Sequence, residues 1–286
     1  MPRTVAIGFF DGVHAGHRLV LDGADAAVTF VNHPDEILLR RPPPKLLMTP
    51  ESRVSMLRSL VRDVVALDFS PELAAMSPAG FVSRYLRGVH TVRCGADWRF
   101  GRAGAGDAAF LSSCGLAVES LAFVETPDGS RISSTRIRAA VASGDFAAAA
   151  AMLGRPWILE GCATDGKRLG RELGFPTVNI APDPRLVVPP VGVYEVSVRG
   201  IAAVANFGFA PTMRDKAWTK PVLELNFEDD ASAFAAFGAD PRGAPVGVEF
   251  KRRIRDERVF DSAASLALQI EADRATVFGG ARAPLA

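Results

Sequence analysis

Cysteine is scarce in this chain of 286 residues, which has only three. Cys94, Cys114 and Cys162 lie far apart and form no CxxC pair, so the sequence indicates neither a structural zinc site nor a disulfide framework. We expect reduced thiols that fill space as small apolar side chains.

Long apolar runs and tracts of one charge are also absent. No apolar run reaches transmembrane length, and the short apolar start of the chain leads into Asp11 and His14 rather than a signal peptide. The 33 basic and 32 acidic side chains nearly balance, and the basic residues at 251–255 are followed at once by Asp256 and Glu257. We therefore expect a cytoplasmic protein without a nucleic-acid or membrane surface, and the sequence leaves its oligomeric state open.

The first half of the chain alternates short apolar runs with helical patterns. Thr49 and Ser77, each followed by proline, are typical of helix starts, and the first of these helices should run to about Leu60. Ser134 is expected to cap a further helix. The predicted strands cover 5–7, 27–30, 64–67, 91–94 and 118–124. Strands that alternate with helices predict a parallel α/β sheet.

The pattern changes after Gly154, which follows an alanine-rich helix predicted over 146–153. Apolar and polar residues then alternate over 194–199, 222–227 and 246–250. This period of two predicts a small antiparallel sheet or barrel, closed by a helix over 262–277. The change places a domain boundary between residues 153 and 154, which gives domains 1–153 and 154–286.

Two histidines three positions apart, His14 and His17, follow the first strand where a helix should begin. Parallel sheets bind ligands at the carboxyl ends of their strands, and a helix N-terminus favours phosphate. Gly16 lets phosphate oxygens approach the backbone, and both imidazoles can donate hydrogen bonds. We interpret this as a nucleotide phosphate site. A His-x-x-His metal site is the alternative, but no nearby set of acids and histidines completes it.

Polar groups follow other strands of the predicted sheet as well. Taken singly, His33 is better explained as a turn residue before Pro34, and the hydroxyls of Ser134 and Thr135 are explained equally well by a capped helix. The groups at this edge of the sheet are His33, Asp97, Phe100, Ser134, Thr135 and Arg138. Their convergence indicates transfer of a nucleotidyl group, where positioning and charge stabilisation provide most of the catalysis.

These motifs and several in the second half resemble the bifunctional riboflavin kinase/FAD synthetases of bacteria. The matching segments span 8–17, 29–34, 95–101, 132–138, 170–179, 192–194, 205–212 and 254–257. The resemblance implies an N-terminal nucleotidyltransferase-like (Rossmann-like) α/β domain that adenylylates FMN to FAD. It also implies a C-terminal six-stranded barrel with a closing helix that phosphorylates riboflavin. Both reactions use ATP and Mg²⁺.

The resemblance also assigns residues in the first half. His14 and His17 would hold the ATP phosphates and take part in catalysis. The other phosphate-binding positions would be Gly8, Phe10, Asp11, Gly12, Gly16, Ser134, Thr135 and Arg138. The nucleotide or flavin pocket would include His33, Asp97 and Phe100. No covalent intermediate is implied, because the FMN phosphate attacks the α-phosphorus of ATP directly.

In the second half, Thr177 and Asn179 match a motif that contacts Mg²⁺ and phosphate. A hydroxyl and an amide both offer the oxygen ligands that Mg²⁺ prefers. Glu224 aligns with the catalytic base, although without the resemblance an outward-facing acid in an alternating strand is the simpler interpretation. A phosphate flap would include Gly166, Gly170, Gly174 and Pro176, and ordinary hairpin turns explain its glycines without the family match.

The segment from His17 to Thr29 is shorter than the family usually has. This raises the alternative of a riboflavin kinase with an impaired adenylyltransferase domain. A non-catalytic flavin- or nucleotide-binding regulator is a second alternative, which Glu224, Thr177 and Asn179 argue against because binding alone needs no base. A nucleotidyltransferase for another acceptor, such as a pyridine mononucleotide, is the third, and the kinase-like barrel argues against it.

Overall fold

The computed structural model describes residues 3–39, 42–164, 177–211, 218–238, 243 and 245–279. The chain forms two compact units, the first made of Met1–Ile137 and Met152–Gly154 and the second of Arg138–Ala151 and Arg155–Ala286. Residues 138–151, which we expected in the first domain, therefore group with the second unit. The four residues predicted for the phosphate flap lie outside the described residues: Gly166, Gly170, Gly174 and Pro176.

Five parallel strands form the sheet of the first unit, in the order β3-β2-β1-β4-β5. The central strand β1 pairs Ala6 with Ala27 on one side and with Arg93 on the other. The strands are β1 (Thr4–Ile7), β2 (Ala26–Phe30), β3 (Asp63–Leu67), β4 (Thr91–Gly95) and β5 (Ala117–Leu121). The predicted parallel sheet is confirmed, and β5 ends at Leu121 instead of Val124.

Six short helices and one 3-10 turn connect these strands. The Thr49 hydroxyl accepts from the Ser52 N–H and the Ser77 hydroxyl from the Gly80 N–H, so both predicted caps are confirmed. The elements are α1 (Ala15–Leu21), α2 (Pro34–Leu38), α3 (Pro50–Arg58), α4 (Pro71–Ala75), α5 (Pro78–Tyr85), η1 (Arg102–Gly104) and α6 (Ala108–Ser113).

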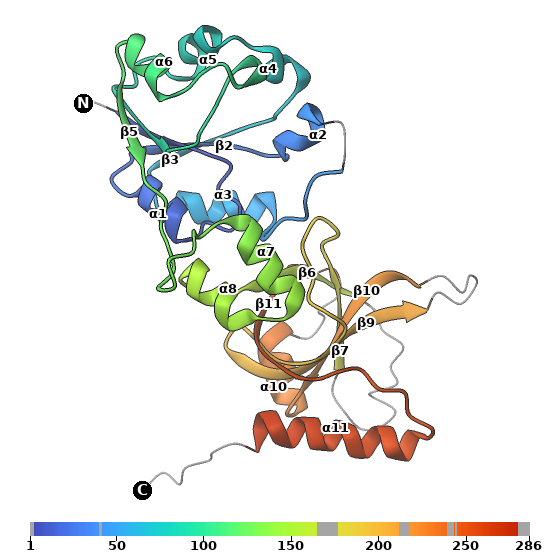
Figure 1. Ribbon diagram of the computed structural model, residues 1–286. Helices are drawn as coiled ribbons and strands as arrows, with labels where there is room; N and C mark the ends of the chain where they lie inside the picture. The colour runs from blue at the N-terminus through green and yellow to red at the C-terminus, as the bar shows by residue number, and fades with distance from the viewer. Residues whose placement is uncertain are drawn as a thin grey trace, which may run out of the picture. The chain divides into compact units, whose positions relative to one another are not determined.

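Apolar side chains cover both faces of the sheet, because successive residues of a strand point to opposite sides. Val5 and Ile7 pack with Phe81 and other residues of α4, α5 and α6, whereas Ala6 packs with residues of α1 and α3 such as Leu57. Figure 1 shows these two groups of helices on opposite sides of the strands. Because helices cover both faces of the sheet, a ligand can reach it at the ends of the strands. Across the described ranges, no helix is long and apolar enough to cross a membrane.

Two helices follow the sheet, α7 (Ser134–Ser143) and α8 (Phe146–Leu153). The predicted cap of α7 is wrong by one residue, since Ser134 begins the helix and the hydroxyl that accepts the Arg136 N–H belongs to Ser133. This leaves the Ser134 hydroxyl available for another contact. Gly154 follows α8 with a φ of 70°, a conformation that glycine adopts readily after a helix.

Six strands of the second unit form a closed barrel in the order β10-β7-β6-β11-β8-β9, with antiparallel neighbours. They are β6 (Ile158–Thr164), β7 (Thr177–Pro182), β8 (Gly192–Val198), β9 (Ile201–Pro211), β10 (Trp218–Phe227) and β11 (Pro245–Arg255). Leu223, Leu225 and Phe227 of β10 are fully buried, so Glu224 and Asn226 point to the outer face of the barrel. The predicted barrel is confirmed.

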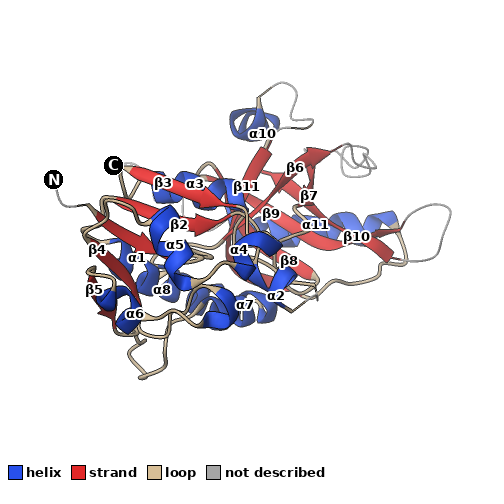
Figure 2. Cartoon of the chain, turned by 90° about the horizontal axis from the view of Figure 1, so that it is seen from above, coloured by secondary structure: helices blue, strands red, loops and turns tan. Residues whose placement is uncertain are grey.

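Two helices accompany the barrel in the described part of this unit, α10 (Asp230–Phe237) and α11 (Ala263–Phe278). α10 lies in the segment between Phe227 and Pro245, for which we predicted no element. Ser262 and Ser265 cap α11 reciprocally, which confirms the predicted closing helix. Figure 2 shows α11 beside β9, against which it packs. α11 therefore covers part of the outer barrel face.

Candidate active sites

A cavity of about 320 Å³ lies at the carboxyl edge of the parallel sheet. Its lining comes from the loops after β1, β4 and β5 and from the starts of α1 and α7. It brings together eight of the predicted residues: Gly8, Phe10, His14, Gly16, His17, Asp97, Ser134 and Thr135. The position is the one at which parallel α/β sheets bind ligands.

The loop after β1 is held in an unusual backbone conformation. Phe10 and Val13 have φ angles of 58° and 42°, and the Val13 N–H donates to the Phe10 carbonyl at 3.0 Å. Gly12 has a φ of 81°, and a Cβ there would lie 2.7 Å from a methyl carbon of Leu47. A left-handed β-branched residue is rare, and such strain occurs mainly where surrounding structure enforces it for a purpose.

Asp11 fixes this loop from behind the cavity. Its carboxylate accepts the Leu47 N–H at 2.9 Å, and its carbonyl accepts the Ser134 hydroxyl at 2.9 Å. The second bond ties the start of α7 to the loop after β1. Among the described residues, Asp11 and Gly12 do not line the cavity, so the structure gives them a shaping role in place of the predicted phosphate contact.

The two histidines of the loop form one stacked unit. Their ring centroids lie 3.6 Å apart with an interplanar angle of 18°, and the edge of Phe10 packs on His17 at 5.4 Å. His14 Nδ1 accepts the His17 backbone N–H at 3.3 Å, so a neutral His14 carries its proton on Nε2. His14 also lines the cavity.

His17 is uncharged at neutral pH. Burial lowers the pKa of His17 well below 6.5, and the charges of His14 and Arg53 lower it further. In the described part of the chain, its buried Nδ1 has no hydrogen-bond partner. An anion in the cavity would favour the protonated ring and supply a partner that the protein itself does not.

The opposite side of the cavity is aromatic and charged. Arg131 pairs with Asp97 at 2.9 Å, and its guanidinium carbon lies 3.3 Å from the centroid of the Phe123 ring. Trp98 also lines the cavity. Flat apolar surface beside a charged pair suits a ligand with a planar ring and polar edges.

Besides Asp11 and Gly12, three further predicted residues are not part of the cavity lining as described. Phe100 is buried in the core and stacks on Trp98 with centroids 4.7 Å apart. His33 caps α2 through the Asp35 N–H and packs on Phe9 with centroids 4.7 Å apart. Arg138 lies on α7, in the second compact unit. Phe100 and His33 thus support lining residues.

Sequence reasoning missed Arg53, which no motif contains. Its side chain is fully buried on α3. Its Nη2 donates to the carbonyls of Phe30 at 2.5 Å and Val31 at 3.0 Å, and the guanidinium lies 4.2 Å from the Phe9 ring centroid. The helical pattern does not distinguish this arginine from a solvated one. Its partners, the carbonyls of Phe30 and Val31, lie at the end of β2, far from Arg53 in the sequence.

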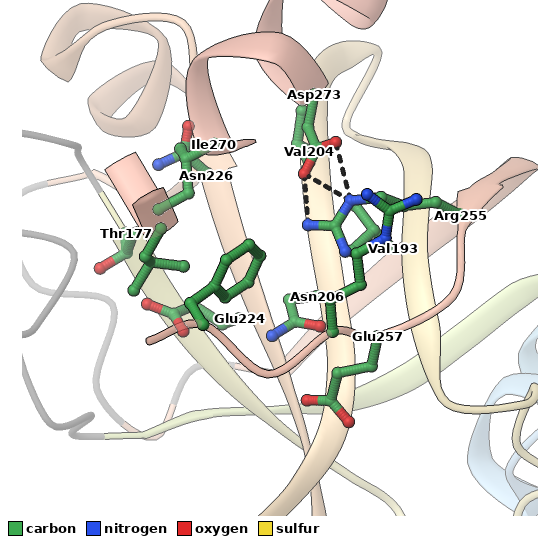
Figure 3. A pocket seen from close by; sticks show the side chains of 13 residues that line it. Thr177, Val193, Val204, Asn206, Glu224, Asn226, Arg255, Glu257, Ile270 and Asp273 are labelled. Atoms are coloured by element: carbon green, nitrogen blue, oxygen red, sulfur yellow. Dashed lines mark hydrogen bonds and ion pairs between the residues drawn. The ribbon is translucent and has the colours of Figure 1, made fainter. Parts of the chain in front are cut away.

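A second cavity, of about 240 Å³, lies on the outer face of the barrel, under α11 (Figure 3). It contains the predicted Thr177 and Glu224. The remaining lining residues are Val193, Val204, Asn206, Asn226, Arg255, Glu257, Arg258, Phe260, Leu266, Ile270 and Asp273. The outward orientation of Glu224 is thus compatible with a role in a site, because α11 covers the outer face.

Strand register brings the polar residues of this site together. Glu224 lies opposite Asn179 of β7 and Asn206 of β9, and Asn226 lies opposite Thr177. Directly opposed residues of antiparallel strands project from the same face of a sheet. Thr177, Asn179, Glu224 and Asn206 therefore share the outer face, although Asn179 is not among the described residues that line the cavity.

Glu224 is the carboxylate at the polar end of this cavity. Burial raises the pKa of Glu224 above its usual 4.5, while a hydrogen bond from the Thr177 side chain partly opposes that rise. An ionised carboxylate with a raised pKa accepts a proton more readily than an exposed one. Glu224 can therefore act as a general base.

An ion pair closes the other side of the cavity. Arg255 forms a bidentate ion pair with Asp273 of α11, with Nε–Oδ1 and Nη2–Oδ2 distances of 2.9 and 2.7 Å, as Figure 3 shows. Leu266 and Ile270 add apolar surface from the same helix. The site thus has apolar surface from Leu266 and Ile270 beside the ion pair toward α11, and polar groups toward β7 and β10, which suits a ligand with an apolar ring and a hydroxylated chain.

Both halves of the chain match known family models. Residues 1–136 match the FAD synthetase model, and residues 153–278 match the riboflavin kinase model. The first match contains the cavity at the parallel sheet, and the second contains the cavity under α11. Two domains of known type are therefore present in this order.

Curated relatives match almost the whole chain. The bifunctional riboflavin kinase/FMN adenylyltransferase of Bacillus subtilis is 33% identical over 95% of this chain and 90% of its own length. The proteins of the same name from Pseudomonas fluorescens and Escherichia coli are 35% and 34% identical, over 94% and 96% of this chain and over 90% and 91% of their own lengths. Both domains thus occur in one polypeptide in these relatives, as they do here.

A solved structure supports the same fold. It is described as a macrolide-efflux protein from Streptococcus pneumoniae, and it superimposes with a TM-score of 0.80 over 96% of this chain and 92% of its own at 29% identity. That likeness concerns the fold, whereas the family rests on the domain matches and the curated relatives. The chain belongs to the bifunctional riboflavin kinase/FMN adenylyltransferase family.

Proposed function

We propose that the two cavities are the two active sites of a bifunctional flavin-cofactor enzyme. In the barrel cavity riboflavin is phosphorylated by ATP to FMN, and in the cavity at the parallel sheet FMN is adenylylated by ATP to FAD. The observation that carries this proposal is that each matched domain holds one cavity with its own reactive groups. These are the His14–His17 pair in the first and Glu224 with Thr177 in the second.

For the kinase reaction, we propose Glu224 as the general base. Its carboxylate accepts the proton of the riboflavin 5′-hydroxyl while that oxygen attacks the γ-phosphorus of ATP, the bond from this phosphorus to the bridging oxygen breaks, and ADP leaves. Asn206, opposed to Glu224 across the strands, is placed to bind hydroxyls of the substrate chain. The apolar wall of Leu266 and Ile270 holds the ring system away from water.

Thr177 and Asn179 fit a magnesium ion. They lie two residues apart on β7, so their side chains project from one face, and both supply hard oxygen atoms. The opposed Glu224 adds negative charge beside them. These residues would hold the Mg²⁺ ion, which would shield the charge of the ATP phosphates, and hydrogen bonding by Thr177 would favour the ionised form of Glu224.

For the adenylyl transfer, we propose that His14 and His17 bind the ATP phosphates. The FMN phosphate attacks the α-phosphorus, the bond to the β-phosphate oxygen breaks, and pyrophosphate leaves. The stacked imidazoles stabilise the charge that builds on the phosphate oxygens, which is the main requirement of phosphoryl-type transfers. The Arg131–Asp97 pair and Phe123, which line the cavity, are placed to receive the flavin.

We propose residues 1–153 and 154–286 as the two functional domains. The matched ranges 1–136 and 153–278 support this division. We also propose that the enzyme works in the cytoplasm, where ATP is available and thiols stay reduced. Cys94, Cys114 and Cys162 are all free thiols, in keeping with that compartment.

A product assay with separate substrate feeds tests the function. The purified chain is incubated with ATP and Mg²⁺ and either riboflavin or FMN, and the flavins are separated by chromatography. We expect FMN and then FAD from riboflavin, and FAD from FMN. Accumulation of FMN without FAD would favour the kinase-only alternative, and the absence of both products from folded protein would refute the proposal.

A further inference from the structure

Arg53 is a buried cation directly behind the cavity of the first unit. Its side chain has 0% of its surface exposed, and burial of a charge is costly unless polar groups surround it. Nη2 donates to two backbone carbonyls, those of Phe30 and Val31. These are the last residue of β2 and the first after it, so Arg53 fixes the carboxyl end of a central strand.

The guanidinium also supports the wall of the cavity. It lies 4.2 Å from the ring centroid of Phe9, a cation–π contact with a residue that lines the cavity. The Phe9 carbonyl accepts the buried Thr29 hydroxyl at 3.0 Å. Phe9 is thus held between β2 and α3, immediately before the strained loop that carries His14 and His17.

Arg53 also acts on His17 of the histidine pair by its charge. The charged groups that act on His17 are His14, stacked on it, and Arg53 from α3, and both disfavour its protonation. Across the cavity, Asp97 and Arg131 pair with one another. Of the two groups that act on His17, Arg53 is the one that is charged at every physiological pH.

We propose that Arg53 is a positioning residue for adenylyl transfer. It holds Phe9 and the end of β2 in place and supplies a permanent positive charge behind the His14–His17 pair, which favours entry of the ATP phosphates. The inference rests on the proposed function of this cavity. If Arg53 had only a structural role, its hydrogen bonds to the two carbonyls would be sufficient. An effect on the pKa of His17 would not be required.

Three variants separate these contributions. Arg53→Met keeps an unbranched apolar side chain but removes the positive charge and the hydrogen-bond donors. Arg53→Lys keeps the charge but lacks the planar guanidinium group with its several N–H donors. Arg58→Met, at an exposed position of the same helix, is the matched control. Each variant is assayed for FMN adenylylation and for riboflavin phosphorylation, which reports on folding of the full chain.

We expect Arg53→Met to lower kcat/KM for ATP in adenylylation about 10- to 100-fold, the scale of a misplaced reacting group, with phosphorylation unchanged. Arg53→Lys should lose less than tenfold, and Arg58→Met should match wild type. Adenylylation by Arg53→Met within twofold of wild type would overturn the proposal. If Arg53→Met loses both activities, adenylylation by Arg53→Lys is the deciding measurement. If Arg53→Lys loses as much adenylylation as His17→Ala does, the charge of Arg53 does not have the proposed role.

A titration of the histidine signals gives a readout that a purely structural role would not move. The chain has four histidines, so the imidazole resonances can be assigned by single substitutions and followed by NMR. The pKa of His17 should rise in Arg53→Met and stay low in Arg53→Lys. An unchanged His17 pKa in Arg53→Met would overturn the proposal. If wild type itself makes no FAD, the proposed function fails, while this titration still decides whether Arg53 controls His17.

Discussion

Thr177 of β7 and Glu224 of β10 lie on neighbouring strands and line one cavity, and hydrogen bonding by the Thr177 side chain lowers the pKa of the Glu224 carboxylate. One partner is the proposed base, and the other is a proposed oxygen ligand for the phosphate-bound magnesium. The bond therefore places the group that takes the proton next to the group that positions the phosphate. Burial and this bond act on the carboxylate in opposite directions, which makes its pKa a sensitive reporter of the site.

Glu224→Gln removes the proposed base while it keeps the size of the side chain. We expect riboflavin phosphorylation to fall by about 10²- to 10⁴-fold, the usual contribution of a general base. FMN adenylylation should persist, because it takes place in the other domain. Glu228→Gln, at the exposed position that follows β10, is the control. Wild-type phosphorylation by Glu224→Gln would exclude the proposed role.

The pH dependence of phosphorylation follows from the raised pKa of Glu224. Only the ionised carboxylate accepts a proton, so activity is present above that pKa and is lost as the pH falls through it. The acidic limb of kcat/KM for riboflavin, which reports the free enzyme, should therefore lie above 4.5. Thr177→Val removes the bond that lowers the pKa, and this limb should move to higher pH. A shift to lower pH would contradict the assignment.

His17→Ala removes half of the stacked pair. FAD formation from FMN should fall about 10²- to 10³-fold, as for loss of a donor to developing charge, while riboflavin phosphorylation continues. His90→Ala, at an exposed position, should have no effect on either reaction. Undiminished FAD synthesis by His17→Ala would show that the pair is not the phosphate site.

Asp273→Ala breaks the buried ion pair that fastens α11 to the end of β11. An uncompensated arginine then remains in a site where Arg255 and Asp273 are 14% and 6% exposed, and the free energy of unfolding should fall by about 3 kcal/mol. Because α11 forms one wall of the cavity, the KM for riboflavin should also rise. Glu271→Ala, an exposed position on the same helix, controls for loss of an acid. Urea denaturation and phosphorylation kinetics measure the two effects, and unchanged values for both would contradict the proposed wall.

Much of the fold is predictable because its signals are local. Apolar runs separated by Thr49-Pro50 and Ser77-Pro78 give the strands and helix starts of the sheet domain, and alternation around Glu224 gives the barrel strands. The His14–His17 pair stands out because it follows a strand directly. Local hydroxyls are less decisive, since Ser133 and Ser134 are both plausible caps and only the contact with Asp11 distinguishes them.

The rest of the site depends on contacts between distant residues. Asn206 and Glu224 come together through strand register, and no spacing in the sequence shows that pairing. Arg53 becomes a buried residue only because the carbonyls of Phe30 and Val31 reach it from β2. Phe100 belongs to the loop after β4, which the sequence assigns to a ligand pocket. Its ring instead packs in the core and stacks on Trp98. In each case tertiary packing decides between roles that the residue type leaves open.

A complementation assay between two variants, each impaired in one activity, tests whether the chain has two independent active sites. Glu224→Gln and His17→Ala are each fed riboflavin, ATP and Mg²⁺, alone and mixed, and the flavins are quantified by chromatography. The account predicts no FMN or FAD from Glu224→Gln, FMN alone from His17→Ala, and FAD from the mixture. Loss of both reactions in folded His17→Ala, or failure of the mixture to make FAD, would contradict two independent active sites in one chain.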